Sequence, residues 1–241
     1  MIWSLNPSSP EFLPIIVALH LGTALALLWY FRRDWVELIG GALRAGTRVD
    51  TTEARTFWLL VAATIPAGII GFLFEKPLRH LFTSVWVVGV CLIINGVILL
   101  IGDYLRKRDG IHTLDNMGWK KAAMIGAAQA LALIPGISRS GVTLVASLAA
   151  GLNYSSAARF SFLMATPIIL GAGLHQVPKL FHSMNSSGLL TVFFAGILSG
   201  LIAYTSIWIL MRYFNKHEIK ALRPFAGYCL LVGAAVLLVL R

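Results

Sequence analysis

The chain has 241 residues, of which 58% are hydrophobic and 12% are charged, and its formal net charge is +10. A soluble domain cannot bury that much apolar surface, so the composition indicates an integral membrane protein. The basic residues lie in short segments between apolar runs. No soluble basic domain remains that would bind nucleic acid, so nucleic acid is excluded as a partner. Membrane lipids with anionic headgroups, or an anionic substrate, fit this charge better.

Six apolar runs follow one another along the chain, and most approach the length of about 20 residues that crosses a bilayer as a helix. They lie at about 13–31, 57–74, 85–102, 160–174, 189–211 and 225–240. We therefore expect an all-α polytopic helical bundle in which residues 1–241 form a single membrane domain. The segments after the first and third runs and before the last are rich in Lys and Arg, which predicts that they are cytoplasmic and that both termini lie outside.

Residues 122–152 have a different pattern. The stretch 122–134 is small and apolar but too short to span a bilayer, and Pro135-Gly136 interrupts it. A second stretch of small residues runs from Val142 to Leu152. A helix that stops and restarts is typical of a re-entrant or broken helix pair. Irregular backbone at membrane depth is tolerated only where it is buried in protein or lines a wet cavity, so we expect a site here.

The polar residues of this interruption favour an anion with several oxygens. Ser138 or Ser140 can cap the restarting helix, whose N-terminus carries partial positive charge and free N–H donors. The Arg139 guanidinium matches phosphate oxygens bidentately, and Gly141 lets a ligand approach the backbone. Two interpretations stay open: Arg139 binds a phosphate, or it is a structural arginine bound to helix-end carbonyls.

Three stretches of the chain carry a family resemblance. They run from Gly126 to Thr143, from Ala158 to Pro167, and from His20 onward to Asp34. The first, with its Pro-Gly-Ile-Ser-Arg-Ser-Gly-Val-Thr core, resembles the second signature of the undecaprenyl-diphosphate phosphatase family, the bacitracin-resistance type. The resemblance covers nearly the whole chain.

The resemblance implies an enzyme of the bacterial plasma membrane that hydrolyses a polyprenyl diphosphate to the monophosphate carrier of cell-wall synthesis. It also implies a fold of inverted repeats, each with a re-entrant helix pair, and a divalent metal, Mg or Ca. Self-association is left open.

The same resemblance assigns the site residues. The catalytic ones are Ser138, Arg139 and Thr143, and the phosphate-binding ones are Gln129, Gly136, Ser140 and Gly141. The arginine would hold the diphosphate and offset charge that develops in the transition state. Whether a serine is the nucleophile or an orienting hydroxyl stays open.

The family's first signature, two glutamates four apart and then a Ser-Ser-Thr-Gly-His type stretch, is not found. Glu11 and His20 have a similar spacing, but apolar residues separate them and position 7 is proline. We interpret Glu11 as a membrane-edge residue and His20 as a packed helical histidine, and keep both only as weak metal-ligand candidates. The remaining carboxylates, including Glu75 and Asp103, are expected in loops or at solvated helix ends.

Two functions from different classes follow from this pattern. The first is the phosphatase, with a start codon assigned too late to include the first signature. The alternative is a degenerate paralogue that acts as a non-catalytic binder or transporter of lipid-linked phosphates, because broken helices are also transporter architecture. Cys91 and Cys229 lie in separate apolar runs and are predicted to be small packing residues, without a disulfide or a metal.

Overall fold

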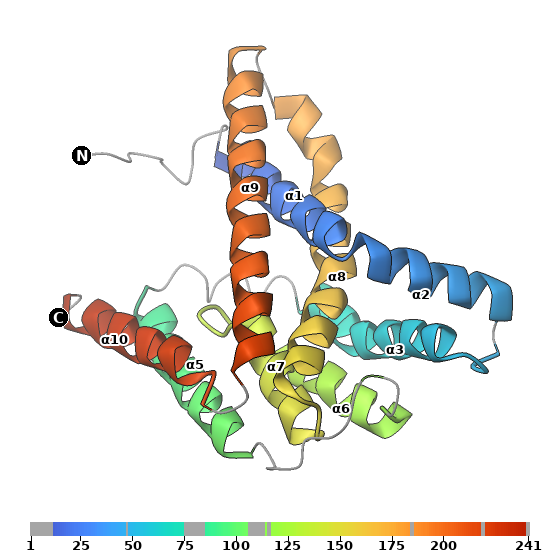
Figure 1. Cartoon of the computed structure of the whole chain (residues 1–241). Helices are drawn as coiled ribbons and strands as arrows, with labels where there is room; N and C mark the ends of the chain where they lie inside the picture. The colour runs from blue at the N-terminus through green and yellow to red at the C-terminus, as the bar shows by residue number, and fades with distance from the viewer. Residues whose placement is uncertain are drawn as a thin grey trace. The chain divides into compact units, whose positions relative to one another are not determined.

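A computed structural model describes residues 12–46, 48–74, 85–105, 114, 117–183, 186–217 and 220–239. Over these residues the secondary structure is helical, apart from short connections, as the apolar runs predict (Figure 1). In chain order the elements are α1 (Phe12–Tyr30), α2 (Arg32–Ala45), α3 (Thr52–Leu73), α5 (Val85–Leu105), α6 (Trp119–Gln129), the 3₁₀ helix η2 (Ala130–Leu133), α7 (Arg139–Ala149), α8 (Tyr154–Ser183), α9 (Ser186–Lys216) and α10 (Arg223–Val239).

Three helical segments within the described residues are long and apolar enough to cross a membrane: Thr52–Gly71, Val85–Leu105 and Leu190–Lys216. A fourth span results if the bent pair Pro14–Tyr30 and Arg32–Ala45 counts as one. The protein is therefore an all-α membrane protein. The sequence predicted six spans. Two of these predicted spans do not meet the same requirement of length and hydropathy within the described residues. One is helix α8, although it is longer than the run at 160–174, and the other is α10, which has 17 residues and is too short.

Helix α2 differs from the prediction. The segment after the first apolar run is too polar to span a bilayer, which predicts a loop, but it forms a helix. Its ends suit the helix dipole, with Asp34 in the first turn and Arg44 in the last. Leu38 and Ala42, four residues apart, are buried on one face. Glu37 accordingly lies inside a helix rather than in a loop or at a helix end.

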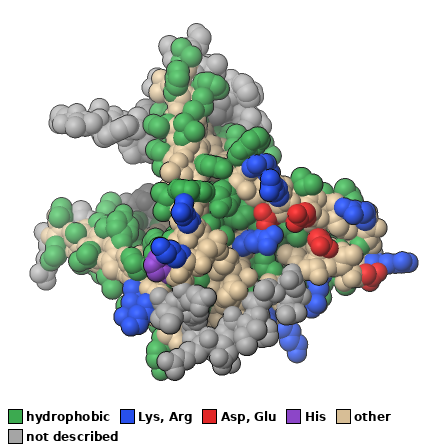
Figure 2. Space-filling view, viewed as in Figure 1, with side chains coloured by type: hydrophobic (Ala, Val, Ile, Leu, Met, Phe, Trp, Pro, Cys, Tyr) green, Lys and Arg blue, Asp and Glu red, His purple; other side chains and the backbone are tan. Residues whose placement is uncertain are grey.

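The chain forms two compact units, and α8 and α9 each contribute to both. The first unit contains residues 1–35 and 166–210. In it, α1 meets α9 at small residues: a Cβ at Gly22 would collide with the backbone of Gly196, so glycine permits the close approach. Thr23 Oγ1 lies 3.3 Å from Ser199 Oγ at the same contact. Exposed apolar side chains follow α9, as suits a lipid-facing helix (Figure 2).

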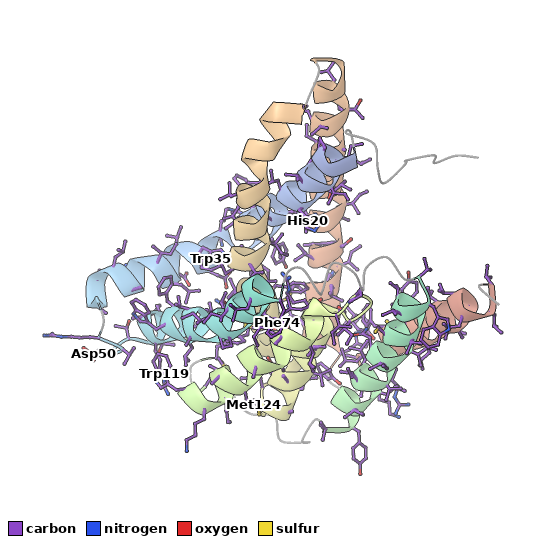
Figure 3. The ribbon with its side chains drawn as sticks, turned by 180° about the vertical axis from the view of Figure 1, so that it is seen from behind. His20, Trp35, Asp50, Phe74, Trp119 and Met124 are labelled. Carbon is purple, nitrogen blue, oxygen red and sulfur yellow. The ribbon has the colours of Figure 1, made fainter. Side chains whose placement is uncertain are left out.

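The second unit, residues 36–165 and 211–241, is organised around α5, which contacts both α7 and α10. A Cβ at Gly96 would lie 2.8 Å from Leu230 Cγ, so α10 packs directly on this face of α5. Helix α3 contacts α6. Trp119 and Met124 mark the exposed side of α6 (Figure 3), while Ile125 is fully buried. This packing holds the two ends of the interrupted segment in place.

Candidate active site

The interruption lies where the sequence predicted it. Helix α6 ends at Gln129, η2 adds one tight turn, and α7 starts at Arg139. Between them Gly136 adopts φ +90°, a left-handed conformation that favours glycine. A Cβ at Gly136 would lie 2.7 Å from the carbonyl oxygen of Val88 and 2.8 Å from Cys91 Cβ. Glycine is therefore required here by the backbone conformation and by packing on α5.

Ser138 is the N-cap of α7, which decides between the two serines proposed for that role. Its backbone is extended, with φ −74° and ψ 120°, and its Oγ accepts a hydrogen bond from the N–H of Gly141 at 3.2 Å. Its carbonyl accepts from the N–H of Val142 at 2.9 Å. Ser140 Oγ lies 3.4 Å from Ser138 Oγ. A Cβ at Gly141 would lie 3.2 Å from Ser138 Cβ, so this glycine gives room to the cap.

The start of α7 presents unused donors. The N–H groups of Arg139 and Ser140 donate to none of the described residues, as is usual for the first turn of a helix. The half-buried Arg139 guanidinium likewise has no hydrogen bond or ion pair within the described part of the chain. The described contacts therefore give no helix-end carbonyl to this arginine. The arrangement suits a phosphate, which takes N–H donors and a guanidinium together.

Thr143 lies one turn further along α7 and is fully buried. Its hydroxyl lies 2.8 Å from the carbonyl oxygen of Arg139, to which it donates, and 2.5 Å from Ser161 Oγ on α8. Ser161 Oγ in turn lies 3.1 Å from the carbonyl oxygen of Ser140. These contacts tie the first turn of α7 to α8, and Ser161 is a residue of the site region to which the sequence assigned no role.

Gln129 closes α6 on the other side of the interruption. Its side chain is 1% exposed, and neither amide atom has a hydrogen-bond partner among the described residues. Buried amides nearly always have partners, so this amide requires a polar partner that the described residues do not supply. Water or a ligand oxygen would satisfy it.

The described residues do not form the metal site that the resemblance implies. Across the described residues, no group of three or more His, Cys, Asp or Glu side chains is placed to hold an ion. His20 lies on α1 (Figure 3), and its Nδ1 hydrogen-bonds the carbonyl of Ile16 at 2.8 Å. It is helical as predicted, but exposed rather than packed. Glu11 and Glu75 lie outside the described residues.

Two other carboxylates face a small polar pocket of about 180 Å³. Glu37 on α2 and Glu53 on α3 line it together with Arg159 of α8. Acidic and basic side chains also mix over α2 and α3 on the surface (Figure 2). This mixture of charges is typical of a solvated polar surface and does not select one ion.

The prediction that Asp103 lies at a solvated helix end is wrong, because its side chain is buried. Its side chain is 6% exposed, at the end of α5. Its Oδ1 accepts from the Tyr154 hydroxyl and from the N–H of Leu222, and its Oδ2 lies 3.6 Å from Arg223 Nε. The carboxylate thus joins α5 to the starts of α8 and α10. These hydrogen bonds and the contact with Arg223 compensate for burying its charge.

Asn95 was also missed by the sequence reasoning. It is 1% exposed in the middle of α5, accepts from the N–H of Ser138 at 3.0 Å and donates to Cys229 Sγ at 3.3 Å. The signal was present, because a lone amide in a run as apolar as 85–102 needs a partner. Cys229 and Cys91 are buried free thiols, as predicted, and Cys229 also accepts this hydrogen bond.

The fold and site define a polytopic α-helical membrane protein with a cationic, donor-rich helix start at a broken helix. The family model described as "Bacitracin resistance protein BacA" matches residues 2–235. The chain belongs to this family.

Curated relatives agree with the family assignment. Undecaprenyl-diphosphatase 2 of Chromobacterium violaceum is 58% identical over 239 residues, covering 98% of this chain and 86% of the relative. Undecaprenyl-diphosphatase of Acidiphilium cryptum is 43% identical, with 99% and 86% covered. Undecaprenyl-diphosphatase 2 of Burkholderia lata is 45% identical, with 95% and 82% covered.

Proposed function

We propose that this protein hydrolyses undecaprenyl diphosphate to undecaprenyl phosphate and inorganic phosphate in the bacterial plasma membrane. The reaction recycles the lipid carrier of cell-wall synthesis and confers bacitracin resistance. The observation that carries the proposal is the start of α7, where the Arg139 guanidinium and the N–H groups of Arg139 and Ser140 are left without described partners. The names of relatives up to 58% identical support the same substrate.

The proposed roles follow from the placement of each group. Arg139 and the free N–H groups hold the diphosphate and offset the negative charge that develops on the phosphoryl oxygens. Ser138 Oγ caps the helix by accepting from the N–H of Gly141. Ser140, whose Oγ lies 3.4 Å from Ser138 Oγ, is therefore the hydroxyl of this pair that would orient a phosphate oxygen. Thr143 keeps the first turn in place through its hydrogen bonds to α7 and α8. Gln129 would offer its unpaired amide to the bound headgroup.

A divalent ion stays part of the proposal, although the described residues supply no ligand set for it. Removal of the ion by a chelator, followed by addition of Mg²⁺ or Ca²⁺, tests whether turnover requires it.

Phosphate release from undecaprenyl diphosphate by the purified protein in detergent tests the function. The proposal expects release that saturates with substrate and falls when Arg139 is replaced. Substrate binding without release in any metal condition would instead support the alternative, a non-catalytic binder or transporter of lipid-linked phosphates. Neither binding nor release would remove both proposals.

A further inference from the structure

One face of α5 packs against the turn at Gly136 and against α7. At one end Gly136 lies against Val88 and Cys91, as described above. Further along, a Cβ at Gly141 would lie 3.4 Å from Leu99 Cδ2, and one at Gly102 would lie 2.5 Å from Val145 Cγ2. The turn and α7 therefore follow α5 closely over several helical turns, and the chemistry of that α5 face decides where α7 begins.

Asn95 is the polar residue on this face and lies opposite the beginning of α7. Its Oδ1 accepts from the N–H of Ser138, the residue immediately before Arg139. Its Nδ2 donates to Cys229 Sγ on α10. The N–H of Ser138 requires the amide oxygen on its side, and Cys229 Sγ accepts from the amide nitrogen on the other side. Both contacts therefore require the same orientation of the Asn95 amide. The described N–H of Ser138 has this side chain as its partner, rather than another backbone group.

We propose that Asn95 is a positioning residue for the phosphate-binding start of α7, and that Cys229 fixes the orientation of its amide. Asn95 itself is not a ligand. It sets the backbone of the cap residue Ser138, and through it the direction of the Arg139 side chain and of the free N–H groups. The role of Arg139 as a phosphate ligand rests on the proposed function. The hydrogen bond from the N–H of Ser138 to Asn95 does not depend on that function.

Hydrogen exchange measured by mass spectrometry tests the positioning directly, without an activity assay. Asn95→Leu keeps a side chain of similar size but leaves the N–H of Ser138 without its acceptor. We expect exchange across residues 136–142 to become at least about tenfold faster, the factor that corresponds to losing one buried hydrogen bond. Thr64→Val is the control, because the Thr64 hydroxyl donates only to Leu60 of its own helix. Unchanged exchange at 136–142, or an equal rise throughout α3, α5 and α10, would overturn the proposal.

The inhibition constant of inorganic pyrophosphate against lipid hydrolysis tests the functional consequence, because it does not depend on the fraction of correctly folded protein. Asn95→Leu should raise this constant about tenfold and Cys229→Ala about threefold. The double variant should match Asn95→Leu alone, since the thiol acts through the amide.

Additive effects of the two substitutions, or constants equal to that of the wild type, would contradict the proposal. If Asn95→Leu does not fold, Cys229→Ala alone must show the same local rise in exchange at 136–142, and its absence counts against the proposal. If the wild-type protein releases no phosphate, the proposed function fails, and the exchange experiment still decides the role of Asn95.

Discussion

The hydroxyl groups of Thr143 and Ser161 lie 2.5 Å apart and join the first turn of α7 to α8. Both side chains are almost completely buried. Thr143→Val removes one hydroxyl at nearly constant shape, together with its hydrogen bonds to the Arg139 carbonyl and to Ser161. This loss should cost about 1–3 kcal/mol of unfolding free energy. Unfolding in detergent, followed for both single variants and the double variant, measures this. Because the two hydroxyls share one hydrogen bond, the double variant should lose less unfolding free energy than the sum of the losses in Thr143→Val and Ser161→Ala. Strict additivity would show that the contact is not energetically coupled.

Gly136→Ala tests the turn before α7. The added Cβ would collide with Val88 and Cys91, and the alanine backbone would have to adopt φ +90°. We therefore expect a loss of about 2 kcal/mol or more of unfolding free energy and a large drop in phosphate release. Gly68→Ala is the matched control, because no atom lies within 4 Å of its added Cβ and Gly68 is inside α3. That control should be neutral or stabilising by up to about 1 kcal/mol. Equal effects at the two positions would refute the packing argument.

The buried Asp103 carboxylate should contribute to stability rather than to substrate binding. Asp103→Ala removes the acceptor shared by Tyr154 and the N–H of Leu222, and should cost about 2–3 kcal/mol. Arg223→Gln is the control, since the Arg223 side chain is 58% exposed and such a pair contributes less than about 1 kcal/mol. Thermal unfolding of the two variants separates them. A larger loss for Arg223→Gln would mean that the ion pair, not the buried hydrogen bonds, carries the effect.

Gln129 can be separated from residues that act only in packing. Because its buried amide has no described partner, Gln129→Met should leave the unfolding temperature unchanged or higher. If the amide serves the substrate headgroup, the same variant should raise KM about tenfold, the cost of one lost hydrogen bond. A variant that unfolds earlier while its KM stays at the wild-type value would show that Gln129 is structural.

The helix break, the capping of α7 and the place of Arg139 could be predicted because they depend on local chemistry: Pro-Gly stops a helix and serine caps the next. The partners of those residues could not be predicted in the same way. Asn95 is 43 positions from Ser138, and Asp103 is 119 positions from Leu222, so only the packing of α5 reveals these pairs. Helix α2 could not be predicted from apolar runs, because a short amphipathic helix contains no apolar run of membrane-spanning length.

In the proposed function, Arg139 holds the diphosphate during hydrolysis. Phosphate release from undecaprenyl diphosphate should be measured side by side for the wild type, Arg139→Lys and Arg139→Ala, each shown to unfold at the wild-type temperature. We expect a loss in kcat/KM of at least about a hundredfold for Arg139→Ala, and an intermediate loss for Arg139→Lys, which keeps the charge without the bidentate guanidinium. Wild-type turnover by a folded Arg139→Ala protein would contradict this role.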